Sequence, residues 1–346
     1  MLKNVKSWLP GLIVSVVFIG LILAFVDERQ LFDAITKANP GWLAVSLVVA
    51  ILWMMMRGVV WRTLLREKAS YWTVFQTLNE GYLLNNFLPL RLGELGRAFL
   101  LSRKTNLTFM EVLPTIIIER VLDVAFSAMI LLSAIPYVPQ ATPESKQIAY
   151  IASILVVVGL FVMYFLARNH VWALGVYDKL SQRWAILQRF AGLVKSLFEG
   201  LAILTDGWLF LRVLLFMVIN WAIAIVQFLV ILLAFFPNAQ PIWAMFGLGA
   251  AAFGGAIPAL PGGVGTFEGF LGGAVALVAG DPTLLATDPK NVLVAANAFA
   301  SALVAHALNY LITGVVGIYA LSREGKTLSS VYKELMQFRQ SGQKDQ

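Results

Sequence analysis

Long apolar runs separated by short polar stretches dominate the chain. Six of these runs can cross about 30 Å of hydrocarbon as helices that rise 1.5 Å per residue. The pattern therefore predicts membrane-spanning helices over residues 9–26, 41–61, 111–136, 148–167, 208–236 and 291–321. The first run follows Lys3 and Lys6 as a signal sequence would, but no small-residue cleavage site follows it, so we expect a retained helix.

Two further apolar regions, 74–101 and 241–280, are interrupted near their middles by residues that break helices. The first interruption runs from Asn85 to Glu94 and leaves arms of about 11 and 10 residues. We interpret both regions as re-entrant hairpins, and the alternative for each is a pair of short spanning helices. The residues expected to break the two hairpins are Pro89 and Gly93 in the first, and Pro258, Pro261, Gly262, Gly263 and Gly265 in the second.

The distribution of basic residues predicts the orientation in the membrane. The polar segments that would lie on one side carry 17 Lys and Arg residues, and those on the other side carry 4. Because basic loops stay on the cytoplasmic side, we expect both termini in the cytoplasm. The order span, hairpin, span then occurs twice with opposite orientation, which predicts an inverted repeat of the kind found in secondary transporters.

Composition supports a membrane protein. Hydrophobic residues make up 59% of the 346 residues and charged residues only 13%, so the bilayer must replace water around much of the chain. The net charge of +7 is assigned to cytoplasmic loops, because no soluble domain carries the basic and aromatic pattern of a nucleic-acid-binding surface. With no cysteine and two histidines, we expect neither a metal site nor a cofactor.

We expect a single transmembrane domain over residues 1–322 and a short cytoplasmic tail over 323–346, with one short helix near 328–338. The longest polar stretch between spans, 168–207, has apolar residues at helical spacing. It predicts an amphipathic cytoplasmic linker, whose role is either regulatory or simply to pack on the helix ends.

Arginines within the membrane segments need partners or a function, because a charge there is costly. Arg91, Glu94 and Arg97 are spaced three residues apart and would share one helix face behind the two asparagines Asn85 and Asn86. A guanidinium group can donate two parallel hydrogen bonds to a phosphate. One hypothesis is that the arginines hold a lipid phosphate, and the alternative is a self-neutralising ladder that only holds the hairpin in place.

Three other carboxylates and one more arginine belong to the candidate site. Glu119, Arg120 and Asp123 cluster early in the third predicted span, where they either pair with the first cluster or mark a helix end that faces the cytoplasm. Glu268 lies alone in an apolar helix, which suits a proton-carrying carboxyl group or a partner for an arginine of the first hairpin. A proton-relay role for His306 is a weaker hypothesis. We find no catalytic constellation in the sequence and expect no enzyme activity.

Three motifs in order resemble the lysylphosphatidylglycerol synthase transmembrane-region family. They are the segment from Asn85 to Arg97, Glu119-Arg120 with Asp123, and the segment from Pro261 to Glu268. The resemblance covers roughly residues 10–322 and implies a flippase-like membrane domain in a bacterial or archaeal plasma (inner) membrane. Members with a synthase activity carry a large cytosolic aminoacyl-transferase domain, so a stand-alone member is expected here.

Three functions remain open at this point. The first is a flippase that moves an anionic or polyprenyl-phosphate-linked lipid between leaflets. The second is an accessory membrane subunit that binds lipid for a glycosyl- or lipid-modifying transferase, which would then be a protein partner. The third is a membrane enzyme that uses Glu94 or Asp123 as a base. The pattern predicts no oligomeric state.

Overall fold

The computed structural model describes residues 2–88, 92–139, 141–184, 188, 206–257, 260–280 and 289–341. All regular secondary structure in these residues is helical. The all-α polytopic membrane class predicted from the apolar runs is therefore confirmed.

Six long helices correspond to the six predicted spans. They are α1 (Leu2–Phe25), α3 (Pro40–Leu64), α6 (Phe109–Ala134), α7 (Pro143–Arg168), α11 (Gly207–Phe235) and α14 (Pro289–Arg323). Within the described residues, five helical stretches are long and apolar enough to cross a membrane: Pro40–Leu64, Pro143–Arg168, Gly207–Phe235, Pro261–Ala279 and Lys290–Arg323. The apolar part of α1 is shorter, at Leu12–Ala24, and α6 has the length of a span but carries several charges.

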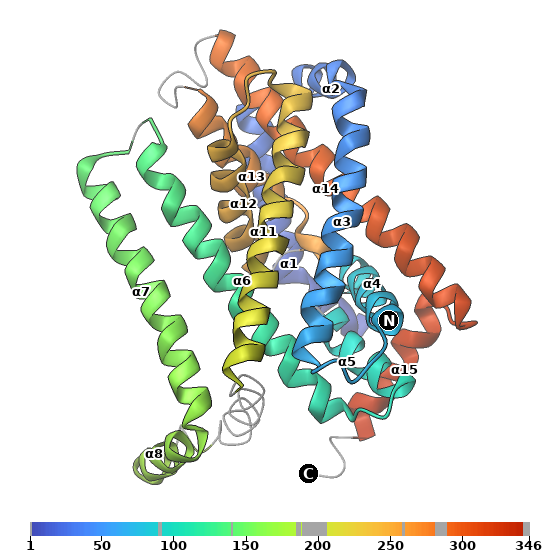
Figure 1. Ribbon diagram of the computed structural model, residues 1–346. Helices are drawn as coiled ribbons and strands as arrows, with labels where there is room; N and C mark the ends of the chain where they lie inside the picture. Colours follow the sequence, from blue (N-terminus) through green and yellow to red (C-terminus); the bar gives the residue numbers. More distant parts are fainter. Residues whose placement is uncertain are drawn as a thin grey trace.

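Each interrupted region forms two helices joined at a break. Hairpin 1 consists of α4 (Tyr71–Phe87) and α5 (Leu92–Lys104), and hairpin 2 consists of α12 (Pro241–Ala256), the 3-10 turn η4 (Pro261–Gly263) and α13 (Thr266–Ala279). Hairpin 1 lies in the lower half of the molecule and hairpin 2 in the upper half (Figure 1), and η4 contacts α4. Re-entry into the membrane and the inverted repeat stay predictions.

The break in hairpin 1 is shorter than expected. Its arms are 17 and 13 residues long, so Asn85 and Asn86 lie in the last turn of α4 and Gly93 lies in the first turn of α5. Asparagine is tolerated there because it can bond across to a neighbouring helix, as Asn86 does to Thr313 of α14. The helix ends before Pro89, since a residue that precedes proline disfavours the helical conformation.

Polar residues at the start of several helices define where they begin. Asn39 caps α3 and is followed by Pro40, Ser70 caps α4, and Asp206 caps α11. Thr108 and Glu111 form a reciprocal capping box at α6. These caps sit in the short polar stretches of the sequence, which is why the predicted helix boundaries agree with the structure to within a few residues.

Three helices lie outside the predicted spans and hairpins. The amphipathic helix α2 (Glu28–Lys37) was not predicted, because ten mostly polar residues lack the length of a span. The helix α8 (His170–Arg183) confirms the helical start of the predicted linker, whose residues 185–187 and 189–205 lie outside the described residues. The helix α15 (Leu328–Ser341) confirms the short helix expected near 328–338.

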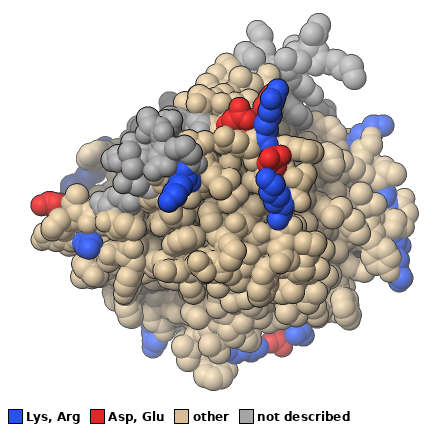
Figure 2. All heavy atoms as spheres, turned by 90° about the horizontal axis from the view of Figure 1, so that it is seen from above, with Lys and Arg blue, Asp and Glu red and all other residues tan. Residues whose placement is uncertain are grey.

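Charged residues are found at both ends of the bundle. Figure 2 shows the end at the top of Figure 1, where most of the visible surface is uncharged and Lys, Arg, Asp and Glu are scattered over it. The opposite end, where α3 finishes, carries Lys68 and Lys104. There Arg212 of α11 pairs with Glu67 at 2.5 Å and holds the pKa of that carboxyl group below its usual range. The orientation in the membrane stays a prediction.

Candidate functional site

Six ionisable side chains from three helices converge inside the bundle. Each comes from a helix that is otherwise largely apolar, so the bundle has to supply its counter-charges from within. We call them the charge network: Arg57 on α3, Glu94 and Arg97 on α5, and Glu119, Arg120 and Asp123 on α6.

Arg57 joins α3 to α6 and α11. One of its terminal nitrogens lies 2.6 Å from Oε1 of Glu119 and also contacts Asp123, to which the second nitrogen donates at 2.7 Å. The same second nitrogen donates to the amide oxygen of Asn220 at 3.4 Å, and the Asn220 amide nitrogen donates to the carbonyl oxygen of Trp53 at 3.2 Å. Arg57 is thereby fixed in its position by two carboxylates and one amide.

Arg97 forms a two-pronged ion pair with Glu119. Its two terminal nitrogens donate to the two carboxylate oxygens at 3.3 and 3.0 Å. The guanidinium carbon also lies 4.3 Å from the ring centroid of Trp61, whose indole nitrogen donates to Thr115 at 3.0 Å. Stacking on an aromatic face and a paired carboxylate together hold the guanidinium plane in place.

Arg120 connects the remaining acids. It contacts Glu119 at 3.0 Å, Asp123 at 3.3 Å and Glu94 of α5 at 3.5 Å. The ion pairs between α5 and α6 confirm that the predicted cluster in the third span pairs with Glu94 and Arg97 of hairpin 1. The described partners of Glu94 and Arg97 lie on the facing helix, and Arg91, the third member of the alternative ladder within α5, lies outside the described residues.

Exposure to solvent increases along the network. The side chains of Arg97 and Glu119 are 3% and 0% exposed, whereas those of Arg120 and Glu94 are 30% and 23% exposed. An incoming ligand therefore meets Arg120 and Glu94 first.

The network is neutral but not fully satisfied. Among the described residues, three arginines face three carboxylates, so these six side chains bury no net charge. The Nε atoms of Arg57 and Arg97 are nevertheless buried without a hydrogen-bond partner among the described residues, and that of Arg120 only reaches Glu94, at 3.5 Å. Buried donors without acceptors are uncommon in proteins and costly, so the site has donors to spare for an oxygen-rich ligand.

A second polar cluster lies at the tip of hairpin 2. The carboxylate of Glu268 contacts Nδ1 of His306 at 2.5 Å through one oxygen and accepts from the backbone N–H of Gly265 at 2.7 Å through the other. Tyr310, one turn after His306 on α14, donates to the carbonyl oxygen of Pro261 at 2.8 Å. Among the described residues, the side-chain partner of Glu268 is therefore a histidine of α14, and the one hairpin 1 arginine near the break, Arg91, lies outside them.

The tip of hairpin 2 is also held by α1. The hydroxyl of Ser15 donates to the carbonyl oxygen of Val264 at 2.7 Å and accepts from the N–H of Leu260 at 2.9 Å. The break itself is made by glycines with positive φ, namely Gly262, Gly263 and Gly265. Only glycine adopts this conformation readily, which confirms the residues expected to break the helix here.

Some residues predicted for the site lie outside the described residues, and some residues that contact the site were not predicted from the sequence. Arg91, Pro89 and Pro258 lie outside the described residues. Arg57 was not among the predicted site residues, although an isolated charge in an apolar segment is a signal that could have marked it. Asn220 and His306 had weaker signals, because single polar residues in membrane helices more often serve packing.

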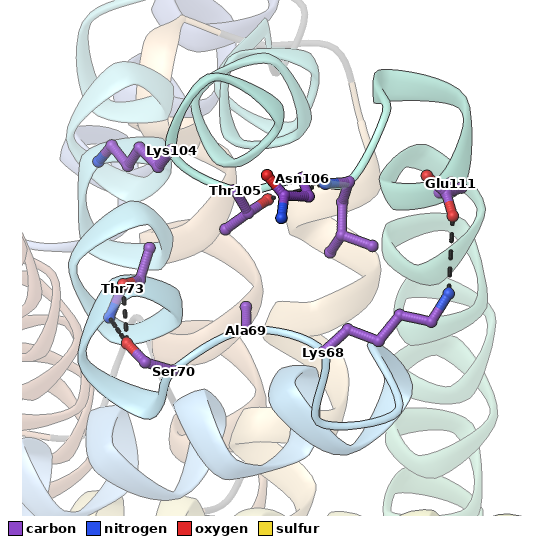
Figure 3. Close-up of a pocket in the computed structure, with 9 residues that line it drawn as sticks. Lys68, Ala69, Ser70, Thr73, Lys104, Thr105, Asn106 and Glu111 are labelled. Atoms are coloured by element: carbon purple, nitrogen blue, oxygen red, sulfur yellow. Dashed lines mark hydrogen bonds and ion pairs between the residues drawn. The ribbon is translucent and has the colours of Figure 1, made fainter.

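A polar pocket opens where α4 and α6 begin. It has a volume of about 460 Å³ and is lined by Lys68, Ala69, Ser70, Thr73, Lys104, Thr105, Asn106, Leu107 and Glu111. Figure 3 shows that Lys68 points toward Glu111, with which it pairs at 3.6 Å. Lys104 pairs with the buried Glu80 at 2.6 Å and with Glu324, so both pocket lysines already have carboxylate partners.

Comparison with known proteins places the chain in a family. The family described as the lysylphosphatidylglycerol synthase TM region matches residues 8–317. The UPF0104 membrane protein MJ1595 of Methanocaldococcus jannaschii is 26% identical over 131 residues, which are 36% of this chain and 39% of that protein. Glycosyltransferase AglD of Haloferax volcanii is 25% identical over 118 residues, which are 33% of this chain and 19% of that protein. Each match thus spans less than half of the relative, and no solved structure matches the chain.

Proposed function

The chain belongs to the lysylphosphatidylglycerol synthase TM region family, and from this premise we propose that it moves a phosphate-bearing lipid between membrane leaflets. The proposed cargo is an anionic phospholipid or a polyprenyl-phosphate-linked sugar. Its headgroup passes through the polar interior of the bundle while its tails stay in hydrocarbon. The chain is proposed to transport the lipid unchanged, in a plasma (inner) membrane, with both termini in the cytoplasm.

The observation that carries this proposal is the set of unpartnered guanidinium donors in the charge network. The Nε–H groups of Arg57 and Arg97 are buried and have no acceptor among the described residues, and the Nε of Arg120 has only the Glu94 carboxylate at 3.5 Å. A phosphate offers several acceptor oxygens and suits the planar donor pattern of arginine. A purely structural ion-pair network would be expected to use these donors.

Arg120 is the proposed first contact for the phosphate. It is the most exposed arginine of the network, and Glu94 on α5 pairs with it at 3.5 Å. A phosphate that takes the place of Glu94 beside Arg120 breaks this connection between hairpin 1 and α6. The Arg97–Glu119 pair still joins α5 to α6, so lipid binding would loosen hairpin 1 at its outer contact, as a first step toward the movement that alternating access requires.

The test reconstitutes the purified chain in phosphatidylcholine vesicles that carry a trace of acyl-labelled phosphatidylglycerol. Reduction of the label from outside by dithionite reports how fast the lipid crosses. A second arm uses labelled phosphatidylcholine, and a third uses a polyprenyl phosphate, so that the two phosphate sources are distinguished. Faster crossing of a phosphate-bearing anionic lipid than of phosphatidylcholine is expected.

The matched variants are Arg120→Gln and Lys37→Gln. Loss of a charge-assisted hydrogen bond of about 1.5–3 kcal/mol would slow crossing roughly 10- to 150-fold in Arg120→Gln. Lys37 lies on α2 in an exposed pair with Asp33, so its substitution should leave the rate unchanged. Wild-type vesicles that match protein-free vesicles for every anionic lipid would contradict the proposal.

A second candidate function is lipid binding for a transferase. The partial match to a protein named as a glycosyltransferase favours it, because that protein combines a similar segment with a much longer chain. Under this alternative, the chain holds lipid without moving it. Co-purification with a transferase, and lipid binding without faster crossing, would support it over transport.

A further inference from the structure

The Glu268–His306 pair at the tip of hairpin 2 is not used by the proposed phosphate site. The two residues are 5% and 6% exposed, and one carboxylate oxygen lies 2.5 Å from Nδ1 of the imidazole. Phe267 covers one side of the imidazole at a ring distance of 4.7 Å. A buried acid and imidazole in direct contact can hold either one or two dissociable protons.

The surroundings of the pair supply no other charge. Within the described residues, neither Glu268 nor His306 forms an ion pair with a third side chain. The helix α12 and the turn η4 have no ionisable residue, and Tyr310 is the nearby titratable group on α14. The carboxylate of α4, Glu80, is paired with Lys104. The charge of the pair is therefore set by its own protons.

One face of α14 attaches both hairpins. Its residues His306, Tyr310 and Thr313 are spaced four and three apart, and they bond to Glu268, to the carbonyl oxygen of Pro261 and to Asn86 of α4. The first two bonds lie on either side of the glycine break in hairpin 2. The protonation state of the pair thus acts directly on the attachment of that tip.

Hairpin 1 lies between the two polar sites. Its first arm, α4, packs against α14, and its second arm, α5, packs against α6, which carries half of the charge network. The tip of hairpin 2 touches α4 through η4. A shift of hairpin 1 on lipid binding would therefore change the contacts that attach both hairpins to α14.

Charge balance connects the two sites. The charge network is neutral when empty, so a bound phosphate monoanion would leave one uncompensated negative charge in a medium of low dielectric constant. The Glu268–His306 pair is neutral with one proton and carries one positive charge with two. Binding of a second proton offsets the charge of the lipid.

Resting on the proposed function, we propose that Glu268 and His306 form a proton-binding site that couples lipid movement to proton movement. One proton enters the pair as one anionic headgroup enters the network, and both leave on the other side of the membrane. The transfer of a monoanionic lipid with one proton moves no net charge. It responds to a pH gradient and not to membrane potential.

The experiment applies a gradient of one pH unit across phosphatidylcholine vesicles that contain the protein and a trace of acyl-labelled phosphatidylglycerol. Coupling of one proton to one lipid gives about a tenfold asymmetry of label between leaflets at equilibrium. In His306→Gln, the ratio falls to 1, whatever the absolute rate. Tyr310→Phe removes a bond to the same tip but spares the pair, so it keeps the asymmetry.

If labelled lipid crosses in the wild type but ends equally distributed between the two leaflets, proton coupling is overturned and the proposed function still stands. If no lipid crosses, the proposed function fails, and the proton site is then decided by infrared titration of the solubilised protein. A protonated-carboxyl band that is absent in Glu268→Gln and changes with pH is expected. A band that is absent from the wild type, or does not titrate, overturns the site.

Discussion

Arg97 and Glu119 face each other across the interface between α5 and α6, with both terminal nitrogens of the arginine donating to the carboxylate. Glu119 also accepts from Arg120 and pairs with Arg57, so one fully buried carboxylate serves three arginines. This residue is the centre of the charge network. Its removal should affect the fold more than the loss of any one arginine.

Glu119→Ala is predicted to destabilise the protein by at least about 3–5 kcal/mol, because it leaves buried arginines without their main counter-charge. The measurement is the free energy of unfolding in mixed micelles. The double variant Arg97→Met/Glu119→Leu should lose less free energy of unfolding than the sum of the losses in Arg97→Met and in Glu119→Leu. Additive costs would show that the two residues do not act as a pair. Lys37→Ala, in an exposed ion pair, controls for unspecific effects.

Arg120→Lys tests whether the proposed phosphate contact needs the guanidinium shape. Lysine keeps the charge but cannot donate two parallel hydrogen bonds, so lipid crossing should fall between the wild type and Arg120→Gln. The initial rate of labelled phosphatidylglycerol crossing, measured against lipid concentration, separates binding from the crossing step. Equal rates for Arg120→Lys and the wild type would indicate that only the charge matters.

Gly93→Ala should destabilise hairpin 1. A Cβ atom at Gly93 would overlap the carbonyl oxygen of Gly81 and the side chain of Asn85, and the backbone of α4 cannot withdraw without separating the arms. Overpacking of this kind costs about 1–3 kcal/mol or more. The matched control is Gly273→Ala in α13, where the added Cβ meets open space. Equal thermal midpoints for the two variants would contradict the tight approach.

Gly262→Ala should be harmful for two separable reasons. The residue has φ of 76°, which costs an alanine about 1–2 kcal/mol, and the new methyl group would coincide with the hydroxyl of Tyr310. Adding Tyr310→Ala removes the clash but not the backbone strain. The double variant should therefore be less unstable than the sum of the single variants. If the losses of stability in the two single variants simply add up in the double variant, Tyr310 does not contact Gly262.

The apolar pattern predicted the fold well because the bilayer imposes a length on every span. The caps at Asn39, Thr108 and Asp206 then confined the helix ends to the polar stretches. The helix α2 was missed because its stability comes from packing, with Ala34 buried against the core formed by α11, α12, α13 and α14. Such tertiary support leaves little trace in a ten-residue pattern.

The site was predicted in part. Spacing along one helix grouped Arg97 with Glu94, but their partners come from α6, and only the folded arrangement fixes which helices face each other. The contact of Glu268 with His306 joins positions 38 residues apart on two apolar helices. No periodicity in the sequence carries such a pairing. The sequence could mark these residues as costly to bury but could not choose their partners.

The bond from Asn86 to Thr313 has a consequence for how the protein is made. The two residues are 227 positions apart, so the attachment of hairpin 1 to α14 has to wait for that much more chain. At about 5–20 residues per second, this delay is on the order of 10–45 seconds after Asn86 leaves the ribosome. During that interval the nascent hairpin lacks its native neighbour. Its biogenesis should therefore depend on insertion factors that shield polar segments within the membrane.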